Sequence, residues 1–222
     1  MLGEMITNSE ALTTKIVSAS PQLKLLQSLQ LVLINYDSQT KITTLWLLGN
    51  ICVNSLADAV AVVQSGIISH VCLACTSDTV KGVRQEALYL LASLVSLFEQ
   101  HDPHALKLFL SHFEVESIML SVLKDFLSHP QIQILALSTF DKLLGSKHRI
   151  TEGMTEGLRY QMNFEKQGGL DVLEEFSKEP NQQIYQMAYD IVEKYFSEKG
   201  HESATMEHYE CKRGSRPDTF LI

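Results

Sequence analysis

The sequence has no excess of positive charge. Its 18 Lys and Arg residues are outnumbered by 26 Asp and Glu residues, which gives a formal net charge of −8 at pH 7. Because the phosphate backbone dominates the affinity of nucleic-acid binding, we do not expect nucleic acid as a direct ligand. The acidic balance favours basic peptides or basic proteins as partners, or it serves solubility alone.

Long hydrophobic runs are also missing, although the 45% hydrophobic content is that of a folded protein. Residues 1–8 do not join a basic stretch to an apolar one, so no secretory signal is predicted. The longest apolar segment, residues 23–34, contains Lys24, Gln27 and Gln30, and it is too short and too polar to cross a bilayer. We therefore expect a soluble, intracellular protein without a membrane partner.

Cysteine is scarce, and the chain has four examples: Cys52, Cys72, Cys75 and Cys211. Cys72 and Cys75 have the spacing of paired metal ligands, but no second cysteine pair accompanies them, and a zinc site needs about four ligands. The first three cysteines lie in apolar helical segments, where a free cysteine serves as a small core residue. We predict that they pack in the core, in a reducing compartment, and that they hold no metal.

Catalytic motifs are absent as well. The sequence contains no glycine-rich phosphate loop, no nucleophile elbow and no H-E-x-x-H pair of metal ligands. The His-Asp-Pro-His segment at residues 101–104 would suit a metal if a third ligand joined it, but its place between a loop and a helix favours a capped helix start. We predict no enzymatic activity, no cofactor and no metal. An enzyme is one of three hypotheses for the function, and a perturbed acid/base cluster in a closed pocket would favour it.

What the chain does contain is one helical pattern in four copies. A small residue anchors each copy, and the intervals between the anchors Thr44, Ala87, Ala136 and Ala188 are 43, 49 and 52 residues. Intervals of this size, filled with helical periodicity, are typical of a helical solenoid. Each copy contains a short first helix, a second helix and a longer third helix. The copies span about residues 10–54, 55–98, 103–146 and 157–197.

Local signals place the ends of these helices. Asp37 and Asp78 are predicted to cap the third helices of the first two copies, and Gly66 is predicted to adopt a positive φ before a second helix. A polar loop at residues 145–157 interrupts the last part of the array. Residues 198–222 are polar and predict a flexible tail, in which Lys212-Arg213 is either a recognition signal or a solvated pair.

Four stretches of the repeats stand out: LWLLGNI (45–51), VVQSGII (62–68), FEKQGGLD (164–171) and QIYQMAYDIVEKYF (183–196). They resemble the importin-α family, the adaptors that carry nuclear localisation signals, and the last two are the most specific. The likeness covers about residues 10–197 and corresponds to the last four of the family's ten repeats. It implies an all-α, right-handed superhelix of about four three-helix armadillo repeats, whose third helices line a concave surface.

The resemblance assigns a peptide-binding role to Trp46 and Asn50. Residues four apart share one helix face, where an indole packs against a Lys or Arg stem and an amide bonds to an extended peptide backbone. On the second copy the matching residues are the acidic Glu86, with Tyr89 and Ser93 in place of the family's Trp and Asn. The alternatives are core packing for Trp46 and an ordinary exposed helix position for Glu86.

The later copies carry Ser138 with Lys142 and Asp190 with Lys194 at these positions, and no basic-peptide pocket is expected there. The resemblance implies the Lys/Arg-rich signal peptides of cargo proteins as partners in nuclear import. It also implies the recycling exportin on the C-terminal repeats, and a place in cytoplasm and nucleus. Importin-β is not expected, because no basic segment precedes the first repeat; a truncated isoform, an incomplete gene model and a reduced paralogue all fit. The alternative function is a general armadillo scaffold without signal-peptide binding.

Overall fold

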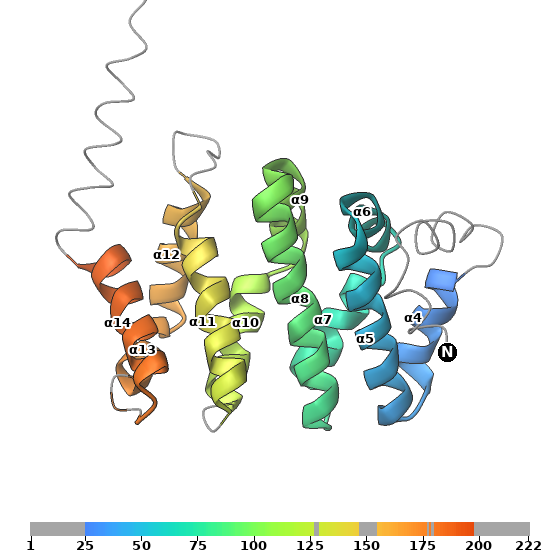
Figure 1. Cartoon of the computed structure of the whole chain (residues 1–222), viewed down its shortest axis with the longest axis horizontal. Coiled ribbons are helices and arrows are strands. Elements are labelled where there is room, and N and C mark those ends of the chain that lie inside the picture. The colour runs from blue at the N-terminus through green and yellow to red at the C-terminus, as the bar shows by residue number, and fades with distance from the viewer. Residues whose placement is uncertain (1–24, 127–128, 147–154, 177, 179, 198–222) are drawn as a thin grey trace, which may run out of the picture.

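The structure is a computed structural model that describes residues 25–126, 129–146, 155–176, 178 and 180–197. Within these ranges the chain forms eleven helices, stacked side by side as a solenoid (Figure 1). The predicted all-α solenoid is therefore confirmed. The short first helix expected in the first copy, the predicted tail at 198–222 and residues 147–154 of the polar loop lie outside the described residues.

The helices fall into three sets that recur along the solenoid. The third helices are α5 (Ser38–Asn54), α8 (Lys81–His101), α11 (Pro130–Leu144) and α14 (Gln182–Phe196). The second helices are α4 (Leu25–Asn35), α7 (Ile68–Ser77), α10 (Val115–Asp125) and α13 (Gly169–Phe176). The first helices are α6 (Leu56–Gln64), α9 (Pro103–His112) and α12 (Glu156–Lys166). Figure 1 shows the third helices in one row, and each packs against the next.

The anchor residues occupy equivalent places in this packing. Thr44, Ala87, Ala136 and Ala188 are all buried, with at most 5% of their surface exposed. Small side chains at these positions let neighbouring helices approach closely. Aliphatic residues of every third helix then join one continuous core, so each repeat is stabilised by the repeats beside it.

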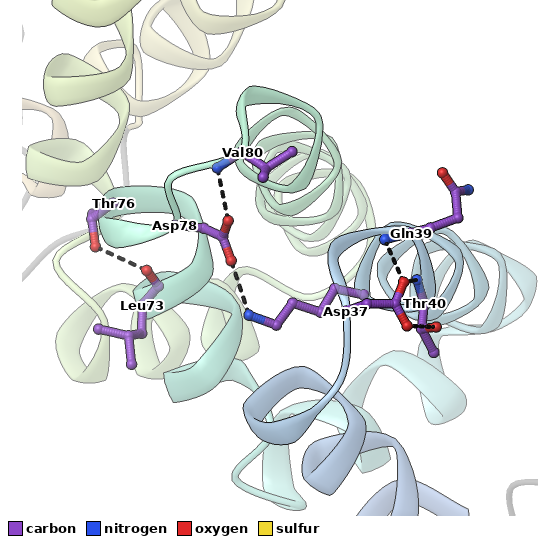
Figure 2. Close-up of polar contacts among 8 residues, drawn as sticks. Asp37, Gln39, Thr40, Leu73, Thr76, Asp78 and Val80 are labelled. Atoms are coloured by element: carbon purple, nitrogen blue, oxygen red, sulfur yellow. Dashed lines mark hydrogen bonds and ion pairs between the residues drawn. The ribbon is translucent and has the colours of Figure 1, made fainter.

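Most turns and helix starts follow the sequence signals. Asp37 caps α5 by accepting hydrogen bonds from the Gln39 and Thr40 amides at 3.0 and 3.1 Å (Figure 2). Asp102 accepts from the Ala105 amide at 3.0 Å at the start of α9, so the His-Asp-Pro-His segment is a capped helix start. Gly66 and Gly168 have φ angles of 82° and 73° in the turns before α7 and α13, a region that favours glycine.

The prediction that Asp78 caps the third helix of the second copy is wrong. α8 begins at Lys81, and its N-cap residue, Val80, makes no side-chain cap bond. Asp78 accepts instead from the Val80 amide at 2.9 Å and from the Lys41 ammonium at 3.0 Å (Figure 2). Its carboxylate closes the turn after α7 and ties it to α5, because the Lys41 ammonium adds an ion pair to the hydrogen bond.

The last third helix exposes side chains whose equivalents are buried elsewhere. In register, Tyr189 of α14 corresponds to Leu45, Leu88 and Leu137. Those leucines are 0% exposed because the next repeat covers them, whereas 50% of Tyr189 is exposed. Tyr185 stacks on Tyr189 with ring centroids 6.3 Å apart. α14 therefore carries a stacking surface that no other described helix covers, and the tyrosine hydroxyls make it compatible with water.

The cysteines of the described part pack as predicted. Cys52 and Cys75 are buried, and Cys72 is half-buried. Burial raises the pKa of the Cys72 thiol to about 11 and the pKa of Cys75 to about 12. The described residues contain no group of three or more His, Cys, Asp or Glu side chains that could hold a metal. No single described helix is long and apolar enough to cross a membrane, while α6 and α7 qualify together by length and composition, with a 78° bend between them.

Candidate peptide-binding site

The residues predicted to bind a peptide lie on one side of two adjacent helices. We call the solvent-facing side of α5, α8, α11 and α14 the third-helix face. Trp46 and Asn50 are on α5, and Glu86, Tyr89 and Ser93 are on α8. Because α5 and α8 pack directly against each other, the fold brings together residues from two different repeats.

Trp46 is an exposed aromatic residue and does not belong to the core. Its surface is 43% exposed, whereas its neighbours Leu45 and Leu47 are buried. In the described part of the chain no Lys or Arg lies over the indole ring. The ring is therefore available to the aliphatic stem and the ammonium of an external Lys or Arg.

Asn50 carries an unsatisfied amide. The side chain is half-buried, and its Nδ2 atom is covered and has no hydrogen-bond acceptor among the described residues. A buried donor without a partner costs about 1–3 kcal/mol. Sequence reasoning expected the amide both to donate to a ligand and to accept from it, but the covered Nδ2 atom cannot donate to a ligand in this orientation. A rotation that exchanges Nδ2 and Oδ1 would bring the donor to the surface, where a peptide carbonyl could accept its hydrogen bond.

The adjacent helix α8 contributes a carboxylate without a cationic partner. Glu86 is half-buried, and burial raises the pKa of its carboxyl group. No Lys or Arg of the described ranges lies within ion-pair distance of it. A ligand ammonium placed there would stabilise the charged form. Tyr89 and Ser93 are half-buried, with a smaller aromatic surface than Trp and with no amide.

Two lysines occupy the positions equivalent to Asn50 on the later third helices. Lys142 of α11 donates to the Ser96 hydroxyl of α8 at 2.6 Å. Lys194 of α14 donates to Asp141 Oδ1 of α11 at 2.9 Å. Each ammonium reaches back by one repeat along the third-helix face. A carboxylate neutralises Lys194, whereas Lys142 has only a neutral hydroxyl as its partner in the described part.

A hollow of about 580 Å³ lies further along this face, between α11 and α14. Its lining includes the carboxylates of Asp141, Asp190 and Glu193, the ammonium of Lys194, and the apolar side chains of Leu137 and Met187. Sequence reasoning missed this hollow because it compared each later repeat only at the positions of Trp46 and Asn50. The sequence does show the three carboxylates, but they come from two repeats, and only the packing of α11 against α14 places them around one hollow.

Comparisons with known proteins agree on the architecture. Residues 159–208 match the family described as atypical Arm repeat. A designed armadillo repeat protein, solved in complex with a (KR)4 peptide, is 13% identical, with a TM-score of 0.67 over 98% of this chain and 84% of its own. An engineered protein solved by a structural genomics consortium is 17% identical, with a TM-score of 0.64 over 86% of this chain and 69% of its own. The fold is an armadillo-repeat solenoid.

A search of the curated proteins gave no match. Armadillo solenoids present extended surfaces for binding, and the architecture seldom hosts an enzyme active site. Trp46 and Asn50 are residues of α5, which belongs to the row of third helices (Figure 1).

Proposed function

We propose that this protein binds extended Lys/Arg-rich peptides on the third-helix face, at Trp46 and Asn50. The observation that carries the proposal is an exposed indole beside an unsatisfied amide, four residues apart on one helix. The indole suits a Lys or Arg side chain, and the amide suits a peptide main chain. The designed armadillo protein that is in complex with a (KR)4 peptide has the same fold, which supports this class of ligand.

Electrostatics favours the same ligand. The net charge of −8 attracts a basic peptide over a distance, in a salt-dependent way. Close to the site, Glu86 offers a carboxylate that no described cation neutralises. Glu86 is therefore the residue proposed to take the ammonium or guanidinium head of the ligand, while Trp46 packs against its stem.

In its finer form, the proposal is an importin-α-like adaptor that takes nuclear localisation signals of cargo proteins for nuclear import. The resemblance of residues 45–51 and 183–196 to that family supports it. The recycling exportin is the further partner proposed for the C-terminal repeats, and cytoplasm and nucleus are the proposed locations.

The test is a titration of a fluorescein-labelled (KR)4 peptide, followed by fluorescence anisotropy at low and at physiological ionic strength. We expect binding that weakens with salt. Trp46→Ala should lose about tenfold or more, as a truncated aromatic anchor does. Asn50→Ala should lose about three- to tenfold, the worth of one or two hydrogen bonds.

Two variants control for general damage. Asn35→Ala removes an exposed asparagine that bonds to the Leu31 carbonyl on α4, and Leu108→Ala removes an exposed apolar side chain on α9. Both should bind like the unaltered protein. Unchanged binding in Trp46→Ala and Asn50→Ala, with folding verified by circular dichroism, would reject the proposed site.

The second candidate function is a protein-interaction scaffold that uses other surfaces. The stacked Tyr185 and Tyr189 on the uncovered side of α14 favour it, because this surface matches the interface between successive repeats. A folded protein that binds no basic peptide but loses a protein partner on Tyr189→Asp would favour this candidate.

A further inference from the structure

Lys142 places an ammonium on the third-helix face beside the proposed site. Its side chain starts on α11 and reaches Ser96 of α8, where Nζ lies 2.6 Å from the hydroxyl oxygen. α8 is also the helix that carries Glu86 and Ser93. An extended peptide that crosses from α5 over α8 toward α11 would therefore pass the α8 residues and then Lys142.

The charge of Lys142 is not compensated by the described residues. Three other cations that bridge repeats pair with carboxylates: Lys41 with Asp78 at 3.0 Å, Lys194 with Asp141 at 2.9 Å, and Arg84 with Asp125. Lys124 of α10, away from the third-helix face, donates to the neutral Gln167 carbonyl at 2.9 Å. The partner of Lys142 is a neutral hydroxyl, which leaves its full positive charge acting on the face. A basic peptide residue over the α8–α11 boundary would meet a like charge.

We propose that Lys142 is a specificity-determining residue that adds a positively charged position to the third-helix face, near the acidic position at Glu86. The inference rests on the proposed function. The face then selects a peptide with a Lys or Arg at Trp46 and Glu86 and with a carboxylate side chain at Lys142. Glu86 and Ser96 are ten residues apart on α8, which is about 15 Å along the helix axis, and an extended chain advances about 3.3 Å per residue. The acidic residue therefore belongs four or five positions from the basic one.

The experiment uses a labelled alanine-based peptide with a central Lys-Arg pair and one Glu at a distance of three, four, five or six residues on either side. Binding is measured by anisotropy for the unaltered protein, for Lys142→Gln and for Lys142→Glu. One Glu position, on one side of the pair, should strengthen binding about two- to fivefold, as a partly exposed ion pair does. Lys142→Gln should abolish this preference, and Lys142→Glu should reverse it. Glutamine can still donate to Ser96, which protects the fold.

Lys166→Gln on α12 is the matched control, because it removes an exposed lysine away from the face, and it should keep the preference. Two results would overturn the role of Lys142 and leave the proposed function intact. One is binding that depends on Asn50 but not on the position of the Glu in the peptide. The other is a preference for one Glu position that survives Lys142→Gln. Failure of every peptide to bind the folded protein overturns both.

Discussion

The Tyr195 hydroxyl of α14 lies 2.8 Å from Asp141 Oδ1 and 2.9 Å from the Asp141 carbonyl oxygen of α11. The same carboxylate oxygen accepts from Lys194 at 2.9 Å. One residue of the third repeat thus receives two donors from the fourth. Gly145, just after α11, leaves the space that the hydroxyl needs, because a Cβ there would collide with it. This cluster holds the last third helix against its neighbour.

Tyr195→Phe should lower the free energy of unfolding by about 1 kcal/mol at neutral pH, the net worth of a hydrogen bond. Burial raises the pKa of Tyr195 to about 12, above its ordinary value of 10.0. The unfolded chain therefore loses this proton first, and the contribution of Tyr195 is complete below pH 10 and lost as the pH rises toward 12. Urea unfolding from pH 8 upward should show a steeper alkaline loss in the unaltered protein than in Tyr195→Phe. Parallel pH profiles would contradict the prediction.

Glu116→Gln should raise the melting temperature at pH 7. Glu116 is only 7% exposed, and its Oε2 atom has no hydrogen-bond partner in the described structure. Burial raises the pKa of this carboxyl despite Arg159 at 3.8 Å. A carboxyl group whose pKa is raised by folding stabilises the folded state at pH values below its ordinary pKa of 4.5. This stabilisation is lost as the pH rises through the pKa of the folded state.

The advantage of Glu116→Gln should therefore shrink at pH 4. Differential scanning calorimetry at both pH values tests this, with the exposed Glu165→Gln on α12 as the control for a change in net charge. A lower melting temperature for Glu116→Gln at pH 7 would mean that the Arg159 ion pair outweighs the cost of burial.

A pair of glycine substitutions should change stability in opposite directions. A Cβ at Gly169 would collide with the Phe164 ring, whereas a Cβ at Gly49 meets nothing within 4 Å. Gly169→Ala should cost about 1–3 kcal/mol by overpacking. Gly49→Ala in α5 should gain about 0.5–1 kcal/mol from helix propensity. Equilibrium urea denaturation measures both, and an unchanged stability of Gly169→Ala would show that the Phe164 ring can move aside at little cost.

The described thiols should be unreactive in the native protein. Burial raises the pKa of Cys52, Cys72 and Cys75, so the reactive thiolate is scarce at pH 8. In a Cys211→Ser background, Ellman's reagent should report almost no reaction before unfolding and three thiols afterwards. Fast native reaction at pH 8 would contradict the buried environment.

Much of the fold could be predicted from the sequence because its signals are local. The anchors Thr44, Ala87, Ala136 and Ala188 mark the repeat, and a buried small residue recurs wherever helices must approach closely. Asp37 and Gly66 act within a few residues of their own position, and both predictions are confirmed. The capping prediction for Asp78 was wrong for the opposite reason, because its ion-pair partner, Lys41, lies 37 residues away.

The candidate site divides in the same way. The sequence by itself determined the all-α solenoid and the presence of Trp46 and Asn50 on one helix face, since helical periodicity depends only on spacing along the chain. Only the tertiary structure decided that Asn50 keeps an unsatisfied donor, that Lys142 reaches Ser96 without a carboxylate, and that acidic residues of α11 and α14 surround one hollow. These features depend on distances between repeats, which spacing along one helix does not encode.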